Sequence, residues 1–106
     1  MKPIDFRNNT WADVQDRFAE GLRREVYRAL ETHGPSTTRD LAERSGIDIL
    51  SLRPRVTELY QLGLVELQNP ESRGGEGVYR VVPWVIAQAR FEKAKAEALE
   101  AQMSFL

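Results

Sequence analysis

The 106-residue sequence contains no cysteine and no long apolar run. The absence of cysteine excludes a disulfide framework, a thiol nucleophile and thiolate zinc sites. No stretch has the length and apolar character of a membrane span. Residues 1–9, MKPIDFRNN, also lack the apolar core of a signal peptide. We therefore expect a cytoplasmic protein with no membrane partner.

The sequence also lacks the residue groupings on which catalysis depends. It has no phosphate-binding loop, and its carboxylates are scattered over the surfaces of the expected helices. The only histidine, His33, ends a predicted helix, where it complements the helix dipole. One histidine and dispersed acids give no metal-ligand spacing. We expect no enzyme activity, no metal and no cofactor.

Basic residues are not in excess, since 15 Lys and Arg face 16 Asp and Glu and the net charge is −1. Proteins that bind nucleic acid usually carry a basic excess. Any DNA binding must therefore come from charge gathered on one face. The hydrophobic content of 42% and the charged content of 29% are those of a soluble globular protein. A chain of this length forms one domain with one core.

Residues 1–33 predict an irregular arm followed by helix. Thr10-Trp11-Ala12-Asp13 matches a capping box in which Asp replaces the usual Glu or Gln. Apolar residues then recur at three- and four-residue spacing as far as Leu30, the pattern of an amphipathic helix. Gly21 interrupts this pattern, so two helices, roughly residues 11–20 and 22–32, are an alternative to a single long helix.

Residues 34–82 predict a short helix, a tight turn, a second helix and a hairpin. Residues 37–40, TTRD, repeat the capping-box pattern and open the short helix, which Gly46 closes. Leu52, Val56 and Leu59 share one face of the second helix, expected over residues 52–62. The β-rich runs 64–68 and 78–82 flank the polar loop NPESRGGEG and predict a two-stranded wing.

The start of the second helix depends on Pro54. Proline inside a helix costs about 3 kcal/mol or more, except in the first turn. With Ser51 as the N-cap, Pro54 falls in the first turn and needs no intrahelical donor. Alternatively, Asp48 caps one extra leading turn.

Residues 83–106 predict a long helix, from about Trp84 to Met103, with a heptad seam rich in alanine. This seam could fold back onto the first helix or pair across a two-fold axis with a second copy. We favour the homodimer, because the seam extends further than a core of this size requires. The expected dimer-interface residues are Trp84, Ala87, Phe91, Ala94, Ala98 and Ala101.

The order of these elements from Gly34 to Val82 resembles the winged helix-turn-helix family of DNA-binding proteins. TTRDLAERSGI resembles the family's second helix and turn, and SLRPRVTELYQLGLVEL resembles its third helix and first wing strand. We expect an α+β, mostly α fold, a winged helix-turn-helix with an N-terminal helical extension and a long C-terminal helix. The small size is also similar to compact phage or prophage regulators, and the sequence indicates no effector pocket.

The resemblance implies sequence-specific binding of double-stranded DNA, with the second helix in the major groove, and transcription regulation as a dimer. Arg53 is the best candidate for reading bases, because arginine donates two bonds to guanine. Glu58, Glu71 and Glu76 depart from a strongly basic pattern, and the arginines could instead pair with Glu58 on a solvated face. The expected DNA-binding residues are Thr37, Thr38, Arg39, Ser51, Arg53, Pro54, Arg55, Thr57 and Arg73.

The alternative function is that of a winged-helix adaptor between proteins in phage or bacterial DNA replication or assembly. The chain ends in Gln102-Met103-Ser104-Phe105-Leu106, which resembles the short peptide that binds the bacterial sliding clamp. An exposed terminal peptide with apolar anchors is a reasonable docking device. However, a five-residue match arises often by chance and Phe105 also continues the heptad seam, so we favour helix packing over clamp binding for this segment.

Overall fold

The computed structural model describes residues 4–69 and 76–103. These residues form five helices and one two-stranded antiparallel sheet. The α+β, mostly helical class predicted from the sequence is confirmed, and the layout is compatible with a winged helix. The elements are α1 (Trp11–Phe18), α2 (Arg23–His33), α3 (Thr38–Ser45), α4 (Ile49–Gln61), β1 (Val65–Leu67), β2 (Tyr79–Val81) and α5 (Trp84–Met103).

The helices before α3 begin and end where their local sequence directs. Thr10 accepts a hydrogen bond from the Asp13 amide at 3.2 Å, and the Asp13 carboxylate accepts one from the Thr10 amide at 2.7 Å. This reciprocal pair confirms the capping box. Gly21 adopts a φ of 55° between α1 and α2, so two helices form and not one.

The start of α4 differs from the favoured prediction. The amides of Ser51 and Leu52 both donate to the Asp48 carbonyl, at 3.0 and 2.9 Å, so Asp48 and not Ser51 is the N-cap. Pro54 therefore lies inside the helix and cannot donate to the Leu50 carbonyl. Burial of the apolar stripe on the opposite face of α4 outweighs the cost of the proline.

The hairpin is attached to the segment that precedes α3. Val65 pairs with Val81, Glu66 with Arg80 and Leu67 with Tyr79. Tyr79 and Ser36 also exchange two backbone hydrogen bonds, of 2.9 and 3.0 Å. These bonds hold the start of β2 beside the N-terminus of α3, the arrangement from which the candidate site is built.

The main core lies among α2, α3, α4 and the hairpin. Its largest fully buried side chains are aliphatic, and the Tyr27 hydroxyl donates to the buried Val82 carbonyl at 3.0 Å. This bond attaches α2 to the end of the hairpin, just before Pro83 and α5. The largest fully buried side chains of the described residues are those of Val26, Leu30, Leu41, Leu52, Leu59, Leu64, Val65 and Val82, in or next to these elements, and of Val14 in α1.

The first half of the α5 seam packs inside the monomer. The Trp84 ring lies 5.3 Å from Trp11, centroid to centroid, and the Phe91 ring lies 5.7 Å from Trp11 and 5.5 Å from Phe6. Ala87 is also buried. The assignment of Trp84, Ala87 and Phe91 to a dimer interface is therefore corrected, because the arm and α1 already cover them.

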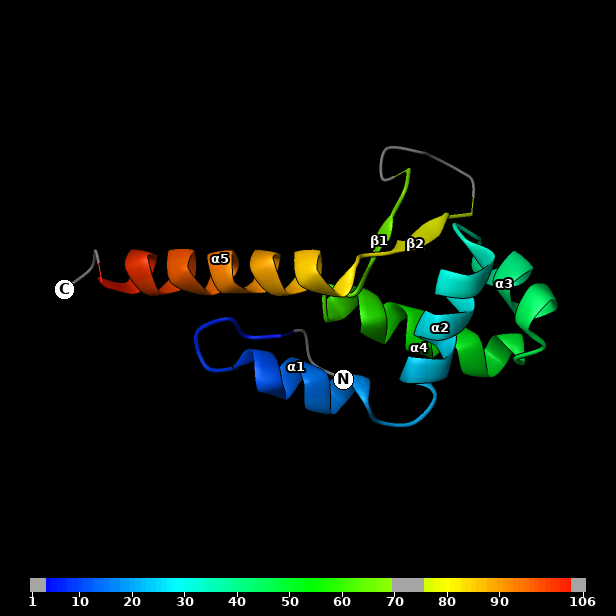
Figure 1. Ribbon diagram of the computed structural model, residues 1–106, viewed down its shortest axis with the longest axis horizontal. Helices are drawn as coiled ribbons and strands as arrows, with labels where there is room; N and C mark the ends of the chain where they lie inside the picture. Colours follow the sequence, from blue (N-terminus) through cyan, green and yellow to red (C-terminus); the bar gives the residue numbers. More distant parts are fainter. Residues whose placement is uncertain (1–3, 70–75, 104–106) are drawn as a thin grey trace.

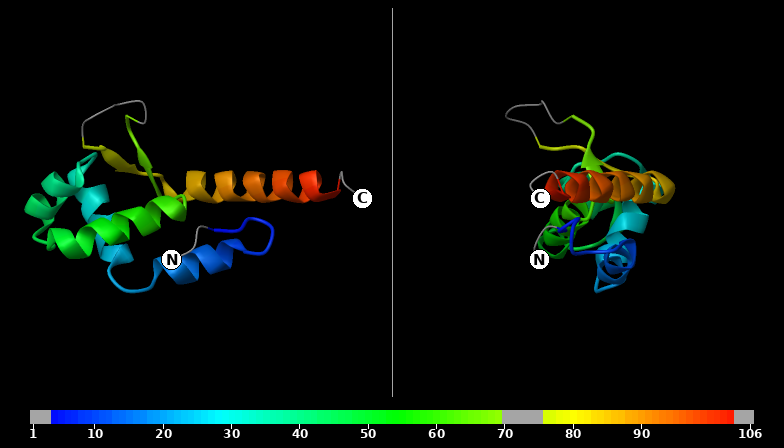
Figure 2. Two further views of the ribbon diagram at one scale, coloured as in Figure 1. Left: turned by 180° about the vertical axis from the view of Figure 1, so that it is seen from behind. Right: turned by 90° about the vertical axis from the view of Figure 1, so that its left-hand side faces the viewer.

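The C-terminal part of α5 extends beyond the rest of the molecule, as Figure 1 and the left view of Figure 2 show. The principal dimensions, 51 × 31 × 23 Å, reflect it. Ala94 and Ala98 are half-buried, while Ala101 is exposed. Pairing of two copies through these three residues stays a prediction. None of the described helices has the length and apolar character needed to cross a membrane.

We expect Phe91→Ala to lower the free energy of unfolding by about 3 kcal/mol or more, because it removes a buried ring from the contact between α5 and α1. Chemical denaturation at low and high protein concentration measures the loss. Val85→Ala, on the exposed side of the same helix, is the control and should change stability by about 0.5 kcal/mol at most. A loss that disappears on dilution would instead place Phe91 between two copies.

Candidate functional site

Residues from three elements surround a surface groove of about 260 Å³, which we call the α3–α4 groove. The N-terminus of α3 forms one wall, α4 forms another, and the chain leading into β2 forms the third. Three of the residues expected to contact DNA, Thr38, Arg53 and Thr57, come together here. The lining is completed by Val56, Glu76, Gly77 and Tyr79.

The α3 side of the groove is fixed by a helix cap. The Thr37 side chain accepts a hydrogen bond from the Asp40 amide at 3.1 Å, which orients the first turn of α3. Thr37 itself is half-buried, and Thr38 follows it at the first helical position. Free amides at a helix N-terminus attract anions. This end of α3 therefore offers hydroxyl and amide donors beside the groove.

Arg53 contributes the positive charge on the α4 side. Its side chain is exposed and lines the groove, one helical turn before Thr57. The Thr57 hydroxyl donates to the Arg53 carbonyl at 3.3 Å, so the hydroxyl is partly engaged within its own helix. Within residues 4–69 and 76–103, no carboxylate forms an ion pair with Arg53.

Arg39 and Glu76 form an ion pair at the edge of the groove, with 3.2 Å between guanidinium and carboxylate. Their side chains are 65% and 44% exposed, so water screens the attraction and the pair contributes little to stability. Glu76 nevertheless introduces negative charge between Arg39 and Arg53. The groove is therefore not uniformly basic, in keeping with the acidic residues noted in the sequence.

The exposed tip of α4 includes a residue that the sequence analysis did not select. Ser51 and Pro54 are exposed, as expected, but the earlier helix start adds Leu50, which is 77% exposed. A residue two positions from Leu52 points to the opposite side of a helix. Leu50 would have been identified if Asp48 had been taken as the cap. It gives the tip an apolar contact point.

Arg55 is not placed to contact DNA, which corrects its prediction. Its guanidinium lies 2.6 Å from the Glu58 carboxylate, and Arg23 of α2 binds the other oxygen of that carboxylate. Arg23 also donates to the Arg17 carbonyl at 2.6 Å. The three side chains in this Arg23–Glu58–Arg55 cluster are 11%, 12% and 32% exposed. The alternative of pairing with Glu58 thus holds for Arg55 and not for Arg53.

Two of the expected contacts cannot be located. Arg73, the predicted wing contact, lies outside the described residues. The same applies to residues 104–106 of the terminal peptide, while Gln102 and Met103 end α5. Among the residues that the structure describes, no His, Asp or Glu side chains gather in a group of three that could hold a metal ion.

Comparison with known proteins assigns no family to the chain. No family model matches the sequence, and no curated protein matches it. Function must therefore be argued from the site.

We expect Glu58→Gln to lower the free energy of unfolding by about 2 kcal/mol, because Arg55 loses its counter-charge and the largely buried Arg23 keeps only the exposed Glu20, at 3.2 Å. Urea denaturation measures the change. Glu43→Gln, an exposed residue of α3, is the matched control and should alter stability by no more than about 0.5 kcal/mol. Equal small effects of the two substitutions would show that the cluster does not secure α4.

Proposed function

We propose that this protein is a winged helix-turn-helix DNA-binding protein that contacts double-stranded DNA through the α3–α4 groove. The observation that carries the proposal is the position of Arg53. It is an exposed cation with no carboxylate partner in the described part of the chain, and it lies beside Thr38 and Thr57. The element order and the hairpin attached next to α3 support the same reading.

In this proposal α4 enters the major groove. Its exposed side carries Ser51, Arg53, Pro54 and Thr57, three small side chains and one long cation, which a major groove can accommodate. Arg53 would donate two hydrogen bonds to a guanine edge. The first turn of α3 would meet a phosphate through its free amides and the hydroxyl of Thr38. The sequence-reading contact and the positioning contact thus come from adjacent walls of one groove.

The Arg39–Glu76 pair need not prevent DNA binding. An exposed ion pair contributes about 0–1 kcal/mol, so a phosphate can replace Glu76 as the partner of Arg39 at small cost. The near-neutral charge of the chain still removes long-range attraction. Binding would therefore rest on few positioned contacts, and its salt dependence would correspond to few phosphates.

Transcription regulation as a dimer belongs to the same proposal. Pairing through the projecting half of α5, at Ala94, Ala98 and Ala101, would present two α4 helices to a near-palindromic site. The buried first half of the seam would remain within each monomer. Each copy would then read one half-site.

A protein–protein adaptor is the second candidate, and two observations favour it. Glu76 already occupies the groove beside the arginines, and Leu50 is an exposed apolar residue at the tip of α4. Paired charges around an apolar anchor are typical of protein interfaces. The two candidates use the same surface, so the effect on DNA binding of removing the Glu76 charge distinguishes between them.

The test is fluorescence anisotropy of labelled random-sequence duplex DNA over a salt series. We expect wild type to bind at low salt and to weaken as salt rises. Arg53→Ala should weaken binding about tenfold, the cost of one good arginine contact. Arg24→Ala, an exposed arginine of α2 away from the groove, is the control and should have less than a twofold effect.

Glu76→Gln, measured in the same assay, should strengthen DNA binding, because it frees Arg39 and removes negative charge from the groove. No binding at low salt by either wild type or Glu76→Gln would contradict the DNA proposal. The adaptor would then become the leading candidate.

A further inference from the structure

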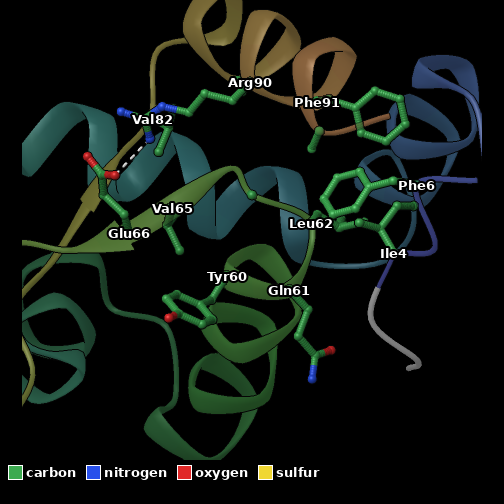
Figure 3. Close-up of a pocket in the computed structure, with 13 residues that line it drawn as sticks. Ile4, Phe6, Tyr60, Gln61, Leu62, Val65, Glu66, Val82, Arg90 and Phe91 are labelled. Atoms are coloured by element: carbon green, nitrogen blue, oxygen red, sulfur yellow. Dashed lines mark hydrogen bonds and ion pairs between the residues drawn. The ribbon is translucent and has the colours of Figure 1, made fainter. Parts of the chain in front are cut away.

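A second cavity, of about 370 Å³, lies between the C-terminal end of α4, β1 and the first half of α5. The N-terminal arm closes one side of it (Figure 3). It shares no lining residue with the α3–α4 groove. Its volume is in the range of small-molecule sites, about 300–1,000 Å³. The sequence indicated no such pocket, because the walls come from four separate segments.

One end of this cavity is apolar. The rings of Phe6 and Phe91 lie against each other, 5.5 Å between centroids, with Ile4 and Leu62 beside them (Figure 3). Lys95 holds the arm in place by donating to the carbonyls of Phe6 and Asn9, at 3.1 and 2.7 Å. The arm is thus attached to α5 while its side chains face the cavity. This end offers a preformed surface for a hydrocarbon or aromatic group.

The other end of the cavity is lined by two charged residues, Glu66 and Arg90. The two carboxylate oxygens of Glu66 each pair with one guanidinium, that of Arg90 at 2.8 Å (Figure 3) and that of Arg80 at 3.0 Å. The hydrogen bond from Arg90 holds the pKa of the Glu66 carboxyl below its usual range, so this group is ionised at neutral pH. Arg80 does not line the cavity, but it pairs with Glu66, so the group of Arg80, Glu66 and Arg90 together carries a net charge of +1.

We propose that this cavity binds a small amphipathic carboxylate, such as a medium-chain fatty acid. The tail would lie along Phe6, Phe91 and Leu62, and the carboxylate would accept hydrogen bonds from Arg90. A guanidinium has five N–H donors, so Arg90 can serve Glu66 and a ligand together. The Arg90 side chain is 59% exposed, which gives the carboxylate access. The inference does not depend on DNA binding.

The test is isothermal titration calorimetry of the full chain with decanoate. We expect saturable 1:1 binding, at least tenfold tighter than that of decyltrimethylammonium, which has the same tail and the opposite charge. Decanol, which has no charge, should bind with intermediate affinity. Equal affinities for the three compounds, or no decanoate binding, would overturn the proposal.

Variants locate the binding. Arg90→Gln should weaken decanoate about tenfold and leave decanol unchanged, while Arg90→Lys should keep most of the preference for the anion. Ala94→Trp should block both compounds by filling the cavity that Ala94 lines. Arg24→Gln is the matched control, and thermal melting checks that each variant is folded. Decanoate binding unaffected by both Arg90→Gln and Ala94→Trp would place the ligand elsewhere and refute the site.

Discussion

Glu58 makes the contact that fixes the candidate site in space. Its carboxylate, on α4, binds Arg23 from α2 and Arg55 from α4, and Arg23 also reaches the carbonyl at the end of α1. On the adjacent face, the apolar stripe of α4 is buried in the core. Two faces of the helix are therefore occupied, and only the side with Arg53 and Thr57 is left to solvent. The orientation of α4 follows from this constraint.

The same cluster explains how a chain of near-neutral charge can still present a cation. Arg55 neutralises Glu58, the acid closest to it on α4, and both lie away from the α3–α4 groove. Arg53 is left without a carboxylate partner among the described residues. The negative charge that the groove does contain is that of Glu76, which forms an exposed and therefore weak ion pair with Arg39. Local placement, and not total charge, determines what this surface can bind.

The sequence predicted the helices and strands well because their signals are local. The Thr10 capping box, the heptad spacing of α5 and the glycine after α1 each act within a few residues. The predicted start of α4 was wrong because the Asp48 side chain makes no capping hydrogen bond, although Asp48 is the N-cap. Arg55 stands three residues before Glu58, a spacing that favours an ion pair on a helix, whereas Arg53 stands five residues before it. The contact that the sequence could not predict is that of Arg23, 35 residues before Glu58. The cavity beside α5 escaped prediction because it forms only when four distant segments meet.

The most direct test of the central claim is an amide chemical-shift map of the ¹⁵N-labelled protein titrated with duplex DNA at low salt. The account predicts that the largest shifts fall at the first turn of α3, in residues 50–57 of α4 and in residues 76–79, around the α3–α4 groove. Residues 91–103 of α5 should change little on binding to a single half-site. Shifts confined to α5, or none at all, would contradict the assignment of the groove as the DNA-binding surface.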